Sequence, residues 1–340
     1  MGVKGTHLFL KKRGLTSSFV ENIDSLSSLF KDPITIHVDL LGSFYPTILT
    51  NFFRHDISMA AKLLINHLNA TLPKNISSLY IDGRRTKEKK CTSEKRQQRK
   101  EKDQKTTERL LRIAEGKAAQ GRRISGSHID AIFRSARRAF ELTPNMMQEI
   151  FETAKEDGWS IVQCDGEADV HIGNLDLTAN AVVVSGDSDL LFYENIHHIL
   201  RPAKQGYLFY KKSDILELLN MTSPQWTCVG VVSGNDYDPN ITGLGIATNC
   251  TLVKNIKQDT VKDILTCYLE LDRVKAKNEE KIAFSKAYKI FGTKKQELVD
   301  AVVETSEKRL LFHQNTMKSK LLKIKQLQQQ QQKAAKDAKG

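Results

Sequence analysis

The sequence predicts an α/β fold built on a mainly parallel, twisted sheet, and two observations support this prediction. Short β-branched or apolar runs alternate with longer segments of helical apolar spacing, a pattern typical of parallel sheets with helical crossovers. Acidic residues also follow several of the short runs closely, and the ligand site of such a sheet lies beyond the carboxyl ends of its strands. The sequence therefore predicts the fold and the place of the site together.

Six runs are expected to form strands: 34–40, 78–82, 159–164, 181–185, 197–202 and 207–210. The run Ala181–Ser185 is continuously apolar up to its last residue, as in a strand that is buried on both faces. The last two runs predict a late hairpin, because a short polar segment separates them.

Helices are expected over Pro46–Leu68, Ser127–Ala139 and Pro144–Asp157, and over most of the chain after Ser223, with a turn at Gly234–Gly245. The stretch 84–123 is polar almost throughout and cannot bury a core stripe. It is therefore expected to be an exposed helix or a mobile segment.

The net charge of +12 is concentrated in two segments of the chain. Residues 84–105 carry eleven Lys/Arg against four Asp/Glu, and residues 317–340 carry seven Lys against one Asp, so the rest sums to about −1. Two basic appendages on a near-neutral body indicate a polyanionic partner. The alternative is that both runs are ordinary solvated helix faces.

The five cysteines are odd in number, scattered, and without a zinc-ligand spacing, which favours a reducing intracellular compartment. No apolar stretch is long enough to span a membrane, so no membrane partner is expected. The sequence also lacks the glycine-rich phosphate-binding loop of ATP-using enzymes, and no small-molecule cofactor is expected.

Seven acidic residues lie after strands or in the turn that follows Ser233: Asp39, Asp82, Glu167, Asp169, Asp187, Asp189 and Asp236. Carboxylates that converge at one sheet edge destabilise one another unless a cation lies between them. Oxygen ligands alone suit Mg²⁺ or Mn²⁺, and a pair of such ions is a standard device for phosphodiester hydrolysis. The alternative is that these acids are solvated loop residues or helix N-caps.

Five motifs in order make residues 1–260 resemble the flap endonuclease/XPG family of 5′ nucleases. They are Met1–Gly5, Val38-Asp39 with Tyr80–Gly83, Gly166–Asp169, Ser185–Leu190, and Ser233–Tyr237 followed by Ile241–Gly245. The resemblance implies a PIN-like nuclease fold in which the seven acids hold two Mg²⁺ ions, for which Mn²⁺ can substitute.

The resemblance also implies roles for residues outside the acidic set. Lys89 and Arg96 stand seven and fourteen residues after Asp82, where the family has catalytic cations on a helical arch that handles single-stranded DNA. Seven-residue spacing places both on one helix face. Gly2, Gly243 and Gly245 match positions that contact DNA. The last two open a helix–two-turn–helix region, which in the family grips duplex phosphates and often binds K⁺.

This chain departs from the family pattern in three places. Asp169 stands where flap endonucleases usually have Glu, Ile246–Asn249 replaces small and basic residues, and no clear sliding-clamp motif is present. The expected organisation is nuclease domain over 1–83 and 126–222, basic arch over 84–125, helical DNA-binding region over 223–316, and a disordered basic Gln-rich tail over 317–340.

These observations predict a monomeric nuclear enzyme that hydrolyses DNA at single-strand/duplex junctions, such as 5′ flaps or gaps. Two rival functions stay open. One is a catalytically silent nucleic-acid scaffold of the same fold, against which the retention of all seven acids argues. The other is a PIN-type ribonuclease, because a two-metal site does not distinguish the sugars.

Overall fold

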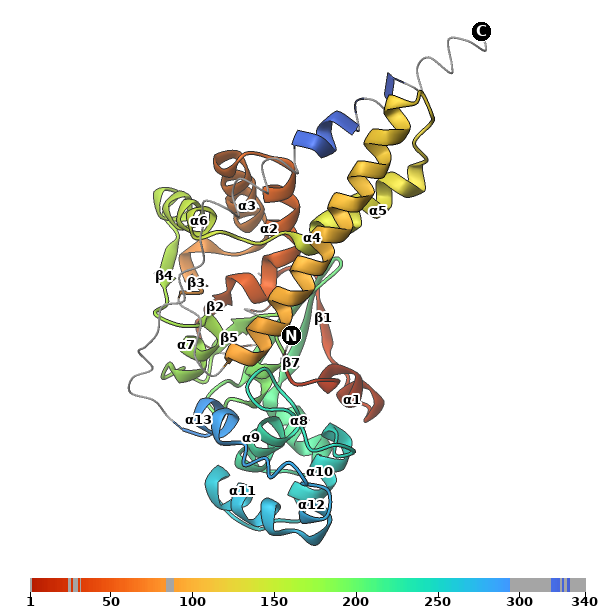
Figure 1. The fold of residues 1–340 in the computed structure, drawn as a ribbon. Coiled ribbons are helices and arrows are strands. Elements are labelled where there is room, and N and C mark those ends of the chain that lie inside the picture. The colour runs from red at the N-terminus through yellow and green to blue at the C-terminus, as the bar shows by residue number, and fades with distance from the viewer. Residues whose placement is uncertain are drawn as a thin grey trace. The chain divides into compact units, whose positions relative to one another are not determined.

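A computed structural model of the chain describes residues 2–23, 26, 30, 32–83, 89–293, 319–324, 326 and 329–330 (Figure 1). The chain divides into two compact units. The first contains Met1–Tyr45, Ile65–Lys90 and Phe151–Val302, and the second contains Pro46–Leu64, Cys91–Ile150 and Val303–Gly340. No helix of the described part is long and apolar enough to cross a membrane.

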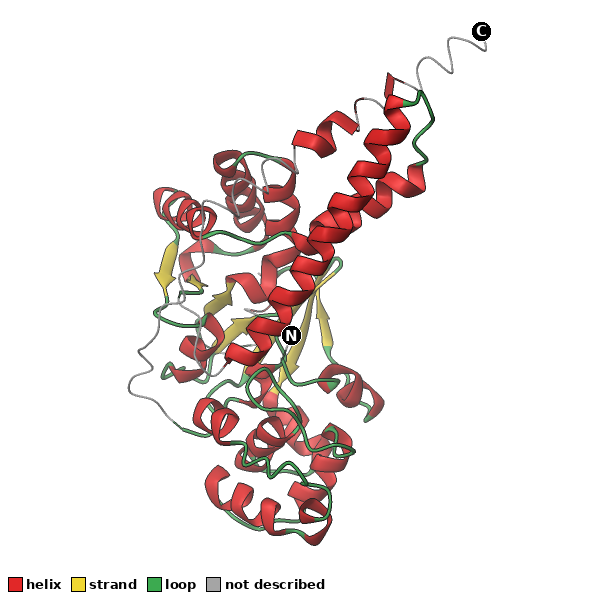
Figure 2. Cartoon of the chain, in the orientation of Figure 1, coloured by secondary structure: helices red, strands yellow, loops and turns green. Residues whose placement is uncertain are grey.

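The first unit contains a seven-stranded sheet in the order β1-β7-β6-β5-β2-β3-β4. Its strands are drawn in yellow in Figure 2. Its strands are β1 Ser18–Val20, β2 Thr35–Asp39, β3 Ser77–Ile81, β4 Ser160–Gln163, β5 Ala181–Val184, β6 His198–Ala203 and β7 Gly206–Lys211. Strands β2 to β6 run parallel, whereas β7 pairs antiparallel with both β6 and β1. The prediction of a mainly parallel α/β sheet is confirmed, and all six predicted runs form strands of it.

Burial on both faces explains why the central strands are apolar. Every residue of β5 is buried, and in β2 the side chains of Ile36 and Val38 are buried as well. Val38 pairs in register with Val184 of β5, and Asp39 pairs with Tyr80 of β3. The three strands therefore end at nearly the same level.

Most helices of the first unit are short: α1 Thr6–Lys12, α7 Ala168–Asn174, α8 Lys212–Leu219, α9 Ser223–Val232, α10 Ile246–Lys254, α11 Val261–Glu270, α12 Asp272–Lys275 and α13 Ser285–Phe291, with the 3₁₀ turns η2 Lys74–Ile76 and η4 Asp189–Phe192. Helix α9 is buried on all sides. Its Trp226 ring stacks on Phe192 with the ring centroids 4.5 Å apart, and the indole N–H donates to the Leu191 carbonyl at 2.9 Å. This packing fixes η4.

The described secondary structure of the second unit consists of helices joined by loops. It contains α4 Lys90–Ala119 and α5 Gly126–Ala139, and it shares α2 Leu40–Arg54, α3 Ile57–Thr71 and α6 Pro144–Glu156 with the first unit. Leu111 and Ala114 of α4 lie in one buried cluster with Ile129 and Ile132 of α5. The expectation that the stretch 84–123 buries no core stripe is therefore wrong for the second half of α4.

Other differences concern short or interrupted elements. The segment Pro46–Leu68 forms parts of two helices, and Pro46 lies inside α2 rather than at a helix start. Helices α1, α7 and α8, of seven or eight residues, and the three-residue strand β1 were not predicted, because segments this short do not show a clear period. Residues 84–88 of the expected arch, 294–316 of the helical region and most of the tail lie outside the described residues.

Gly83 offers a test of the junction between β3 and the segment after β4. Its N–H donates to the Gly166 carbonyl at 2.7 Å, and a Cβ at this position would lie 1.8 Å from the Cys164 carbonyl oxygen. We expect Gly83→Ala to lower the free energy of unfolding by about 1–3 kcal/mol, as overpacking does, measured by urea denaturation. Gly126→Ala, which meets open space at the start of α5, is the matched control. Equal stability of the two variants would contradict the close approach.

Candidate metal centre

The sheet topology brings four of the predicted acids to one edge. Asp39 is the last residue of β2, Asp82 directly follows β3, and Asp187 and Asp189 follow β5 after a short turn. Since β5, β2 and β3 are parallel neighbours, their carboxyl ends lie side by side.

The other three acids come from segments that follow β4 and α9. Glu167 is the N-cap residue of α7 and Asp169 lies in its first turn, while Asp236 lies in the turn after α9. Oxygen atoms of Asp169, Asp187 and Asp189 all lie within 4.8 Å of one another, and all three side chains are buried. The structure therefore gathers acids from distant parts of the sequence into one site.

Burial and mutual repulsion raise the pKa values of this cluster. Burial, with the charges of Asp82 and Asp169, raises the pKa of Asp39 to about 8. Burial and Asp169 likewise raise the pKa of Glu167 to about 8. The pKa of Asp189 is raised well above its ordinary value by burial, then by Asp187, Asp169 and Asp236. Asp236 is thus close enough to act on the cluster electrostatically.

Backbone N–H groups stabilise three of these carboxylates by hydrogen bonds. The N–H groups of Val3, Gly42 and Ala168 donate to Asp189 Oδ1 at 2.7 Å, to Asp39 Oδ1 at 2.9 Å and to Asp82 Oδ1 at 2.8 Å. Charge-assisted bonds of this kind are about twice as strong as neutral ones. They hold the carboxylates in place but leave their net charge unchanged.

Gly2 is the predicted DNA-binding residue that lies against the cluster. Its φ of +88° is in the left-handed region, and a Cβ on it would lie 2.2 Å from Asp187 Oδ1. Only glycine allows the backbone to pass the carboxylates so closely. The lack of space for a side chain thus explains why this position is a glycine. The contact of Gly2 with DNA stays a prediction.

Lys89 is the cation of the cluster among the described residues. Its ammonium forms an ion pair with Glu167, lies 3.4 Å from Asp169 Oδ2, and lies 4.9 Å from the centre of the Tyr237 ring. Burial would lower the pKa of Lys89, but the charges of Asp169, Glu167 and Asp189 outweigh it and raise the pKa well above its ordinary value. Lys89 is therefore charged, and its positive charge acts on Glu167, Asp169 and Asp189.

The expectation that Lys89 and Arg96 share a helix face stays a prediction. Lys89 precedes the first residue of α4 and turns into the carboxylate cluster of the first unit. Arg96 lies on α4 in the second unit. Its action on a phosphate at the carboxylates stays a prediction.

A divalent metal fits the cluster. Asp189 Oδ2 is buried and receives no hydrogen bond from the described residues, so a strongly polar oxygen has no partner among them. The donors are oxygen atoms only, which suits a hard cation such as Mg²⁺ or Mn²⁺. The cluster of Asp169, Asp187 and Asp189 can thus bind a metal ion.

The structure gives no support to a K⁺ site in the turn between α9 and α10. Gly243 has a φ of +77° and Gly245 is the N-cap residue of α10, so both glycines lie in the predicted turn. The carbonyl oxygens of Ile241 and Leu244, however, already accept hydrogen bonds from the side-chain amides of Asn240 and Asn249. The expected K⁺ site therefore finds no support.

Three residues that border the cluster had no role in the sequence prediction, although Ser185 and Tyr237 lie within two of its motifs. The Ser185 hydroxyl donates to Asp39 Oδ2 at 2.8 Å and accepts the Asp187 N–H at 3.0 Å, so it ties two acids together. The hydroxyls of Tyr193 and Tyr237 are buried and without a hydrogen bond. Burial and the charges of nearby acids, Asp169 first, raise the pKa values of both tyrosines well above the ordinary value.

Comparison with known proteins supports the fold and a distant relationship. No protein-family model matches the chain. Over 182 residues the chain is 26% identical to exonuclease 1 of Xenopus laevis. The matched segment covers 52% of this chain but only 23% of that protein.

Two solved structures share the fold over nearly the whole chain. Flap endonuclease-1 from Methanococcus jannaschii has a TM-score of 0.51 at 14% identity, covering 97% of this chain and 100% of that chain. Human GEN1 in complex with Holliday junction DNA has a TM-score of 0.53 at 15% identity, covering 95% and 77%. The chain thus has the fold of these two proteins, and its 26% identity to exonuclease 1 makes it distantly similar to the flap endonuclease/XPG family.

Proposed function

We propose that the chain is a divalent-metal-dependent, structure-specific DNA endonuclease or 5′ exonuclease that acts in replication or repair in the nucleus. One observation carries the proposal: oxygen atoms of the buried Asp169, Asp187 and Asp189 lie within 4.8 Å of one another, and the neighbouring acids act on them electrostatically. Structural acids are normally paired, whereas an uncompensated oxygen cluster is typical of a site that holds metal ions. The distant relationship to 5′ nucleases supplies the reaction class.

The residues of the proposed site have two roles, metal binding and orientation of the phosphate. Asp169, Asp187 and Asp189, with the four other acids, would hold Mg²⁺ or Mn²⁺, two ions in all. When bound, such ions lower the pKa of water and stabilise charge on the leaving oxygen. The Lys89 ammonium, at the edge of the acids, would orient the scissile phosphate. Arg96 would act on the same phosphate from the arch.

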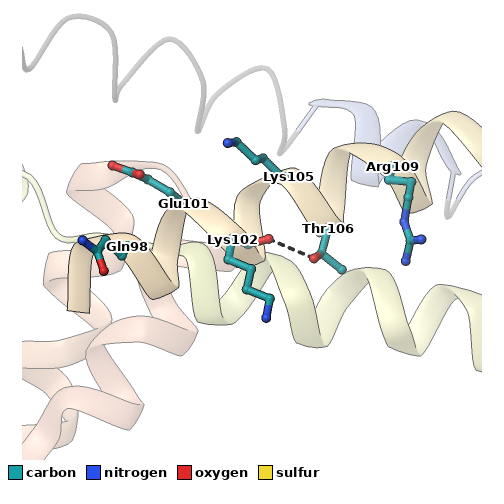
Figure 3. Close-up of a pocket in the computed structure, with 6 residues that line it drawn as sticks. All are labelled: Gln98, Glu101, Lys102, Lys105, Thr106 and Arg109. Atoms are coloured by element: carbon teal, nitrogen blue, oxygen red, sulfur yellow. Dashed lines mark hydrogen bonds between the residues drawn. The ribbon is translucent and has the colours of Figure 1, made fainter. Parts of the chain in front are cut away.

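The basic residues of α4 fit the phosphates of a nucleic acid. Lys102 and Arg109 extend from the same side of α4, two turns apart, and line a shallow pocket with Lys105 (Figure 3). All three side chains are exposed. We propose that this segment is the arch that contacts single-stranded DNA and that the helices after Ser223, with Gly243 and Gly245, contact the duplex.

The proposal is tested by Asp187→Ala. Loss of one ligand removes metal-ion stabilisation of several kcal/mol, so we expect the single-turnover cleavage rate to fall at least about a thousandfold. Binding of a labelled 5′-flap DNA should stay equal or tighten, because a negative charge near phosphate is removed. Asp259→Ala, which changes an exposed acid of the first unit, is the control.

A panel of substrates decides between this function and its rivals. Wild-type protein with Mg²⁺ is incubated with flap, gapped, nicked, bubble and four-way DNA and with the matching RNA. Binding without cleavage of any substrate would favour the silent scaffold. Faster cleavage of the RNA set would favour the ribonuclease.

Lys89→Ala and Arg96→Ala should separate catalysis from binding. A cation directed at the scissile phosphate typically contributes about 10²–10³ in rate, whereas one of many arch charges contributes about 1 kcal/mol or less to binding. Lys102→Ala should show only the small loss of binding. Lys102 is a better control than Lys100, which pairs with Glu141 at 3.2 Å. Equal, small effects in all three variants would mean that the arch attracts DNA without directing the phosphate.

Metal binding should also appear in the pH dependence of stability. Because the pKa values of Asp39 and Glu167 are raised to about 8 in the folded chain, the folded state binds more protons than the unfolded state from about pH 4 to about pH 8. In EDTA the contribution of this cluster to the free energy of unfolding should therefore fall as the pH rises through that window.

Mg²⁺ replaces these protons, so the rise in Tm that it causes should be larger at pH 8 than at pH 6. Differential scanning fluorimetry measures both values. The variant Asp39→Asn should show a smaller Mg²⁺ increment at pH 8. An increment that does not depend on pH would contradict the metal assignment.

A further inference from the structure

The turn between α9 and α10 contains a cluster of oxygen atoms, and one buried side-chain amide donates hydrogen bonds to them. Asn249 Nδ2 donates to the Val232 carbonyl at 2.9 Å, to Ser233 Oγ at 3.1 Å and to the Leu244 carbonyl at 3.0 Å. The Asn249 side chain is fully buried. These three oxygens come from the end of α9 and from the far side of the turn, so the amide joins both ends of it.

The orientation of this amide is fixed by its other atom. Asn249 Oδ1 accepts a hydrogen bond from the Tyr268 hydroxyl of α11 at 2.8 Å. The opposite orientation would set the amide oxygen against the carbonyls of Val232 and Leu244, which cannot donate. The nitrogen therefore faces the oxygen cluster.

A second amide completes the arrangement. Asn240 Nδ2 donates to the Ile241 carbonyl at 3.0 Å and to the Leu244 carbonyl at 3.3 Å. Asn240 also packs against Gly234, where a Cβ would lie 2.8 Å from Asn240 Oδ1. Leu244 O thus receives two amide donors, one from each asparagine.

Converging carbonyl oxygens require a positive partner, which is either a bound cation or N–H donors. In this turn N–H donors occupy the position. A cation at Val232 O and Leu244 O would compete with the Asn249 amide for these oxygens, and its displacement would leave the buried N–H donors of Asn249 without acceptors.

We propose that Asn249, together with Asn240, takes the place of a monovalent cation in this turn, so that the turn keeps its shape and binds duplex phosphate without K⁺. The duplex-binding part rests on the proposed function, whereas the shape of the turn does not. Asn249 acts as a positioning residue, since it holds the backbone of Gly243–Gly245 rather than contacting DNA.

The test measures Tm without DNA, and duplex affinity, in KCl, NaCl and tetramethylammonium chloride at equal ionic strength. Equal ionic strength is needed because any phosphate contact weakens with salt. We expect the same Tm and the same duplex Kd in the three salts for the wild-type chain. A higher Tm or tighter duplex binding specifically in KCl would overturn the proposal.

Asn249→Asp supplies the complementary result. The change replaces the amide donors with a carboxylate oxygen among other oxygens, so the variant should have a lower Tm in tetramethylammonium chloride and regain part of it as K⁺ or Na⁺ is added. Asn255→Asp is the control, because Asn255 is an exposed residue at the end of the same helix. Should Asn249→Asp not fold, Asn240→Asp, at a less buried position, is measured in the same salts. Variants that respond to the cation no more than the control would overturn the proposal.

The two readouts keep this inference separate from the proposed function. If the wild-type chain binds no duplex in any salt, the proposed function fails, but the Tm series still decides whether the turn depends on a cation.

Discussion

Electrostatic repulsion among buried acids is the constraint on which the rest of the structure depends. Two unit charges about 5 Å apart repel by about 3 kcal/mol at the effective dielectric of a protein, and oxygens of Asp169, Asp187 and Asp189 all lie within 4.8 Å of one another. Lys89 offsets one charge through Glu167 and Asp169. The elements that carry the acids must therefore be held by packing strong enough to oppose this repulsion, and the rest of the charge must be neutralised by protons or by metal ions.

The packing that opposes the repulsion lies directly behind the acids. Val182, Val183 and Val184 are buried immediately before the turn that carries Asp187, and Trp226 stacks on Phe192 at the end of the 3₁₀ turn that begins with Asp189. Burying an aromatic ring of this size contributes about 1.5–3 kcal/mol, comparable with one repulsive pair. The all-round burial of α9 is thus coupled to the site, although α9 itself carries none of the acids.

The sequence predicted the sheet and the acids because both depend on local pattern. A buried parallel strand is a short apolar run, and the residue after it is fixed at the sheet edge whatever the rest of the chain does. Lys89 could not be predicted in the same way, because its direction depends on whether helix α4 begins before or after it, and helix boundaries are poorly specified by composition. Ser185, Tyr193 and Tyr237 border the site through contacts between elements far apart in the chain, which no periodicity reports.

The carboxylate cluster and the turn after α9 are both rich in oxygen atoms, but the two sets of oxygens are satisfied in different ways. In the turn the oxygens are neutral carbonyls, and two asparagine amides satisfy them with N–H donors of the chain itself. In the cluster the oxygens belong to acids, and N–H donors can bind them without removing their charge; Asp189 Oδ2 lacks even a donor. N–H donors of the chain can therefore satisfy neutral oxygens, whereas a carboxylate cluster depends on an ion from solution for its neutralisation. This difference in formal charge, rather than in the number of oxygens, explains why one site is expected to respond to Mg²⁺ and the other to be indifferent to K⁺.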